Sequence, residues 1–187
     1  MSAASDPTPL DEVARFTARL RQRSWFAAVG QPANDAETAT ARDYLAGLGL
    51  SDLAIEWVSG WRAAEHATKA SGSPADWWQA EEDERQALLR IVRRTMAEAD
   101  YLAAMNSVVL EATEVVIGPA IAAASRQNVV DPALTKVAAG AATQACHHAA
   151  LAIAAAAPDD HPFTLKFRLY AGGRWPLGAV GDTFYLF

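Results

Sequence analysis

The sequence contains a single cysteine, Cys146. An intramolecular disulfide is therefore impossible, and nothing in the chain requires an oxidising compartment. The first residues lack both the basic start and the apolar stretch of a secretory signal peptide. We therefore expect a cytoplasmic protein in which Cys146 is a small buried hydrophobe.

Basic residues are also scarce. The chain has 16 Lys and Arg against 22 Asp and Glu, giving a net charge of -6 and a pI near 5.2. This balance argues against nucleic-acid binding, which usually needs a basic face. The glycine-rich nucleotide motifs, the G-x-S-x-G nucleophile elbow and the H-E-x-x-H zinc motif are missing from the sequence as well. These gaps favour a protein that is not an enzyme.

Alanine, by contrast, is abundant, with 43 occurrences in 187 residues. Alanine has the best intrinsic helix propensity, and its small side chain lets helices approach closely. The length suits one domain, so we predict a single all-α domain over residues 1–187. Alanine richness also suggests a bacterial source.

The longest uncharged stretch runs from Val137 to Pro158. A helix this poor in charge must be covered on most sides, because a helix that is apolar all round is buried. Its alanine content and its two histidines do not fit a membrane span, so we expect no membrane association. The sequence thus predicts a bundle of six or seven helices around this central alanine-rich helix.

Proline and capping residues mark the expected helix boundaries. Capping residues followed by proline indicate helix starts at Thr8-Pro9, Ser73-Pro74, Asp131-Pro132 and His161-Pro162. The patterns between these marks predict helices over 9–29, 35–47 and 51–69, and over 74–118 with a break between Glu98 and Asn106. Residues 1–7 are expected to form a flexible N-terminus.

The C-terminal segment gives conflicting signals. Residues 163–169 alternate between apolar and polar side chains like a strand, yet they follow a possible cap at His161 and a proline at 162 like a helix. In an all-helical context we favour the helix. Residues 172–187 contain several glycines, so we expect an irregular extension that could end in a short strand.

The best candidate for chemistry is a pair of carboxylates, Glu111 and Glu114, on an otherwise apolar helix. If this side faced inward, His147 or His148 could add nitrogen and complete a transition-metal or catalytic site. Di-iron carboxylate proteins use Glu-x-x-His, which this chain lacks. The alternative interpretation is that the carboxylates form a solvated face and the histidines are hydrogen-bonded core residues, so we predict no firm metal or cofactor.

A second candidate is an aromatic ligand pocket. Four tryptophans lie close in sequence, with a histidine between them: Trp57, Trp61, His66, Trp77 and Trp78. If two neighbouring helices brought them together, they could hold a small apolar or cationic ligand. Ordinary aromatic packing is the favoured alternative.

The function that the sequence favours is binding to another protein or to a second copy of the chain. Aromatic and arginine side chains dominate interface energetics, and the chain ends on an apolar tail. This tail either docks on its own domain or inserts into a partner. The expected contact residues are Arg174, Trp175, Phe184, Tyr185, Leu186 and Phe187.

Overall fold

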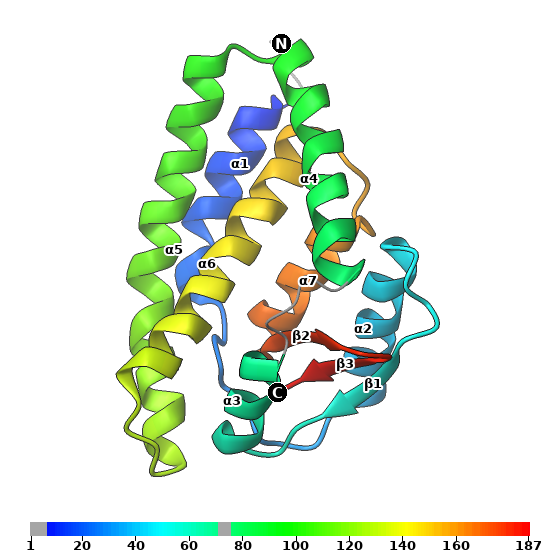
Figure 1. Cartoon of the computed structure of the whole chain (residues 1–187). Coiled ribbons are helices and arrows are strands. Elements are labelled where there is room, and N and C mark those ends of the chain that lie inside the picture. Colours follow the sequence, from blue (N-terminus) through cyan, green and yellow to red (C-terminus); the bar gives the residue numbers. More distant parts are fainter. Residues whose placement is uncertain (1–6, 71–75) are drawn as a thin grey trace.

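The computed structural model describes residues 7–70 and 76–187 as a mostly helical fold with one small sheet (Figure 1). The helices are α1 (Pro9–Ala18), α2 (Asp35–Gly47), α3 (Trp61–Ala70), α4 (Asp76–Thr95), α5 (Glu98–Arg126), α6 (Pro132–Ala154) and α7 (Pro162–Ala171). The strands are β1 (Ala54–Trp57), β2 (Pro176–Val180) and β3 (Thr183–Leu186). The prediction of a helical bundle is confirmed.

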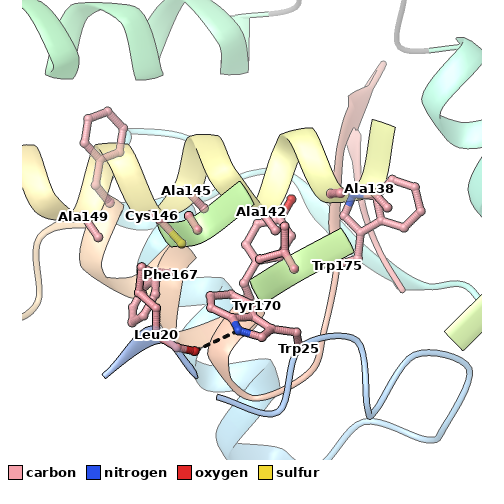
Figure 2. Close-up of a cluster of buried hydrophobic side chains, with 14 of the residues drawn as sticks. Leu20, Trp25, Ala138, Ala142, Ala145, Cys146, Ala149, Phe167, Tyr170 and Trp175 are labelled. Atoms are coloured by element: carbon pink, nitrogen blue, oxygen red, sulfur yellow. Dashed lines mark hydrogen bonds between the residues drawn. The ribbon is translucent and has the colours of Figure 1, made fainter. Parts of the chain in front are cut away.

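Helix α6 lies at the centre and packs against α1, α4, α5 and α7. Alanines line its inner face, so the large side chains of the neighbouring elements come close to its backbone. In Figure 2, Ala142 lies by the ring of Tyr170 and Ala138 lies by the ring of Trp175. The predicted central helix is therefore confirmed.

Cys146 also lies on this inner face and is fully buried. Burial raises the pKa of its thiol to about 12, which keeps the thiol protonated. The sequence interpretation of Cys146 as a small hydrophobe agrees with this environment.

Several predicted helix starts are also confirmed. Thr8 forms a capping box with Asp11, and the side chain of Asp131 accepts hydrogen bonds from the first turn of α6. His161 caps α7 through its ring nitrogen, so the helical alternative for 162–170 is correct. The predicted cap at Ser73-Pro74 and most of residues 1–7 lie outside the described residues.

The first predicted helix is too long. Helix α1 ends at Ala18 instead of continuing to 29, and a short 3-10 turn, Leu20–Gln22, follows it. Trp25 and Phe26 are drawn into the core, and the Trp25 indole donates to the Leu20 carbonyl at 3.0 Å (Figure 2). The free energy gained by burying these two rings exceeds the free energy that a longer helix would contribute.

The predicted helix over 51–69 is wrong in its first half. Residues Ala54–Trp57 form strand β1, and α3 begins only at Trp61. The reason is a distant partner, because β1 pairs in parallel with β3, with Ala54 opposite Thr183 and Trp57 opposite Leu186. Local sequence carries no information about that pairing.

The long pattern over 74–118 also needs correction. The break lies between Thr95 and Glu98, just before the expected range, and α5 continues past Pro119 to Arg126. A proline removes one helical hydrogen bond, and burial of the helix around it compensates here, since Val116, Ala120 and Ala123 are fully buried.

The C-terminal extension is more regular than expected. β2 and β3 form an antiparallel hairpin, and β3 is the central strand of the order β1-β3-β2. One face of the sheet packs on α2 and α7 in a second hydrophobic cluster, which includes Tyr44, Leu169, Phe184 and Leu186. The tail is therefore an integral part of the fold.

Candidate functional site

Of the two histidines of the central helix, His147 is half-buried and His148 is buried. His148 is buried and its ring stacks on Phe163, with centroids 4.3 Å apart and an interplanar angle of 24°. Its Nδ1 atom has no hydrogen-bond partner among the described residues. Burial first, and then the positive charges of Lys166, His147 and Arg85, lower the pKa of His148 to about 3, although Glu82 opposes this shift. His148 is therefore a neutral packing residue at physiological pH.

Acid is expected to destabilise the protein through His148. Its folded pKa of about 3 lies below its ordinary value of 6.5, so between these values the unfolded chain binds the proton more readily. The stability contribution is complete above pH 6.5 and decreases as the pH falls, by about 2 kcal/mol at pH 5. Urea midpoints at pH 7.5 and pH 5 measure it. His148→Leu should reduce this difference and leave the part that comes from His147 and His161, whose pKa values burial also lowers, whereas His66→Gln, at an exposed histidine, should keep it.

The carboxylates of the predicted metal site bind an arginine. Arg21 Nε lies 2.6 Å from Glu111, and its Nη2 atom lies 3.1 Å from Glu114. Over residues 7–70 and 76–187, no three His, Cys, Asp or Glu side chains gather in a way that could hold a metal ion. The expected grouping of Glu111, Glu114 and His147 or His148 does not form, because this side of α5 faces the segment after α1.

The four tryptophans do not share one pocket. Trp61 is buried against Trp175 and Phe187, whereas Trp77 packs on Phe184 and donates to the Tyr44 hydroxyl. Trp57 lies on β1 beneath the Arg174 guanidinium, and Trp78 is half exposed. The favoured alternative, ordinary aromatic packing, describes this arrangement better than the aromatic-pocket hypothesis does.

His66 does line a cavity, of about 450 Å³, between α3 and the sheet. The other polar side chains at this cavity are Glu56, Arg62 and Tyr185, and the apolar ones are Val58, Ala63, Ala67 and Val180. None of the four predicted tryptophans contributes to it. Of the five residues predicted to form an aromatic ligand pocket, only His66 therefore lines this cavity.

The predicted contact residues of the tail are occupied within their own chain. Trp175, Phe184, Leu186 and Phe187 are almost completely buried, and only Tyr185 is partly exposed. Trp175 and Phe187 exchange two backbone hydrogen bonds, with N–O distances of 2.6 and 2.9 Å. Of the two alternatives, the tail docks on its own domain, so these residues form no free interface.

Arg174 has a structural role that the sequence did not reveal. Its guanidinium donates to both carboxylate oxygens of Glu37 and to the backbone carbonyls of Ala28, Gln31 and Pro32, at 2.6 to 2.9 Å. All these acceptors lie more than 100 residues away in the chain. Arg174 therefore fixes the loop before α2 to the start of the hairpin.

A second buried network joins three helices. Lys166 of α7 contacts both carboxylate oxygens of Glu81 of α4, at 2.7 and 2.8 Å. The Tyr44 hydroxyl of α2 donates to Glu81 at 2.7 Å, and Trp77 donates to that hydroxyl at 2.5 Å. Sequence reasoning missed this network because a lone lysine in an alternating segment gives no sign of burial.

The most unusual surface is the outer face of α5. Helix α5 packs against α6 and α1 and lies on the opposite side of the molecule from the sheet (Figure 1). Apolar side chains that follow helical spacing lie on this face: the exposed Leu102, Val109, Leu110 and Ile121 and the half-buried Ile117, which we call the α5 stripe. Leu110 is 73% exposed and Ile121 is 51% exposed. Contiguous apolar surface of this kind marks interaction sites.

One charged side chain, Glu114, lies within the α5 stripe. Glu114 lies one helical turn after Leu110 and one turn before Ile117, and it pairs with Arg21. Asn106 and Thr113 contribute the polar atoms of the surface. The stripe is therefore a mainly apolar surface whose one carboxylate is paired with Arg21, on a chain of net charge -6.

Comparison with known proteins gives no further guide, because no protein-family model, curated protein or solved structure matches the chain. The surfaces and contacts of the described residues are what indicate its function.

Proposed function

We propose that the protein is a non-enzymatic module that self-associates through the α5 stripe. The observation that carries this proposal is the row of exposed Leu, Val and Ile side chains on one helix. Removing such side chains from water is the main driving force of protein association.

A second copy of the chain suits this surface because the one carboxylate of the stripe, Glu114, is paired with Arg21. In a twofold dimer the same patch meets itself, so a charged patch would place like charges together. In the α5 stripe the Arg21 pair reduces that repulsion, although the whole chain carries a net charge of -6.

The size of the stripe indicates a weak dimer. From Leu102 to Ile121 it extends for about 30 Å at the rise of an α-helix. One helix face covers less than the roughly 800 Å² per partner of a standard interface. We therefore expect dissociation in the micromolar range.

A membrane is the other apolar environment that the helix could meet. Among the described residues, α5 alone is long and apolar enough to cross a membrane, and 33% of its most apolar window is buried. By length and composition the core helix of a soluble protein passes the same test. Glu111 and Glu114 lie in the middle of this helix and pair with Arg21, and charged groups at mid-membrane depth are costly. These pairs favour a protein partner.

Sedimentation equilibrium over a range of concentrations tests the proposal. The wild-type chain should form dimers at high micromolar concentrations, and Leu110→Glu should remain a monomer because two like charges would meet at the twofold axis. Ile91→Glu is the matched control, since Ile91 is an exposed apolar residue on α4, outside the stripe. A wild-type chain that remains monomeric, or a Leu110→Glu variant that dimerises like the wild type, would refute self-association through α5.

A further inference from the structure

A groove on the side of the molecule formed by α1, α7 and the end of α6 has not been assigned a role. It consists of two adjoining cavities of about 460 and 470 Å³, which share Phe16, Ile153 and Ala157 among their lining residues. The floor is apolar, and arginines surround it. We call it the arginine groove.

The floor is built from aromatic and aliphatic side chains of three helices. The rings of Phe16 and Phe167 lie with centroids 4.8 Å apart, and Ile153 of α6 lines both cavities. Phe167 is fixed from behind by Trp25, whose ring centroid is 6.0 Å away. Such a floor can receive an apolar chain without rearrangement.

The rim is positively charged on an otherwise acidic protein. Arg15, Arg19, Arg23 and Arg168 line the groove, against only two carboxylates, Glu12 and Asp159. Glu12 already pairs with Arg15. Arg19, Arg23 and Arg168 make no ion pair within the described part of the chain, so the rim carries an excess of unpaired positive charge beside a single free carboxylate.

Arg23 joins the charged rim to the apolar floor. Its guanidinium carbon lies 5.8 Å from the centroid of the Phe167 ring. A guanidinium over an aromatic face is attracted to that ring and keeps its planar N–H groups available for an anion. Arg168, one residue after Phe167, is exposed and lines the same cavity.

We propose that the arginine groove binds an amphipathic carboxylate, with its hydrocarbon chain on the Phe16, Ile153 and Phe167 floor and its headgroup between Arg23 and Arg168. Each cavity has the volume of a small-molecule site and is too small for a protein segment with side chains on all sides. Arginine suits the headgroup because its fork of donors matches a carboxylate. This role is independent of self-association through α5.

Calorimetric titration with dodecanoate, below the concentration at which it forms micelles, tests the proposal. Dodecanoate should bind saturably, whereas dodecanol and dodecyltrimethylammonium should bind at least tenfold more weakly because they lack the negative charge. Arg23→Gln combined with Arg168→Gln should weaken dodecanoate binding at least tenfold.

The matched control is Arg90→Gln combined with Arg93→Gln, which changes the charge equally at exposed positions of α4. It should alter dodecanoate affinity less than twofold, and circular dichroism of both double variants should match the wild type. The proposal is overturned if dodecanoate fails to bind, if dodecanol binds equally well, or if both double variants lose affinity alike. Binding to anionic vesicles without any binding of monomeric dodecanoate would overturn it too, since it would indicate a membrane surface as the ligand.

Discussion

Deleting Thr183–Phe187 is expected to unfold the protein instead of removing a partner contact from a folded chain. The deletion removes β3, which hydrogen-bonds to β1 on one side and to β2 on the other. It also removes three fully buried side chains, Phe184, Leu186 and Phe187. Truncating one buried Phe or Leu typically costs about 2 to 5 kcal/mol, and a whole domain is stable by only about 5 to 15 kcal/mol.

The measurement is circular dichroism during heating, together with the soluble yield. The full chain should melt cooperatively, and the shortened chain should show no cooperative transition. Two point variants show how much individual side chains of β3 contribute to the melting midpoint. Phe184→Ala should lower the midpoint strongly, and Tyr185→Ala should lower it less, because Tyr185 points to the other face and is only partly buried. A shortened chain that melts at the wild-type midpoint would show that β3 is not needed for the fold.

This expectation reverses the interpretation of the tail that the sequence favoured, and the reason is physical. An apolar C-terminus has the same composition whether it docks on its own domain or on a partner. The deciding contact is the pairing of Thr183 with Ala54, which joins segments almost 130 positions apart. Local patterns could not reveal it, whereas the caps at Thr8, Asp131 and His161 were predictable because capping depends on residues within one helical turn.

The contacts of the candidate site were also impossible to predict from local sequence patterns. Helical spacing correctly placed Glu111 and Glu114 on one side of a helix, but it could not say what that side would meet. This side meets Arg21, which lies about 90 positions earlier in the chain and pairs with both carboxylates. The α5 stripe was equally hidden, because an exposed apolar residue and a buried one look alike in sequence. Only the packing of α5 against α6 and α1 distinguishes Leu110 from Val108.

Replacing Lys166 with Met is expected to destabilise the protein by about 3 to 5 kcal/mol. Lys166 and Glu81 are both more than nine-tenths buried, and the ammonium group lies 4.9 Å from the centroid of the Trp77 ring. In the variant, the Glu81 carboxylate would remain inside the protein with only the Tyr44 hydroxyl as a donor. Burial and the nearby Glu81 charge hold the pKa of Tyr44 well above its ordinary value, so Tyr44 keeps its proton and cannot neutralise the carboxylate.

Two further variants separate loss of the pair from loss of packing. Lys166→Met combined with Glu81→Gln should recover at least half of the lost stability, because a neutral amide is cheaper to bury and its oxygen still accepts from Tyr44. Lys69→Met removes an exposed lysine paired with Glu65 and should cost less than about 1 kcal/mol. Urea unfolding of the four chains measures these differences. If Lys166→Met were no more harmful than Lys69→Met, the buried pair would contribute nothing to holding α2, α4 and α7 together.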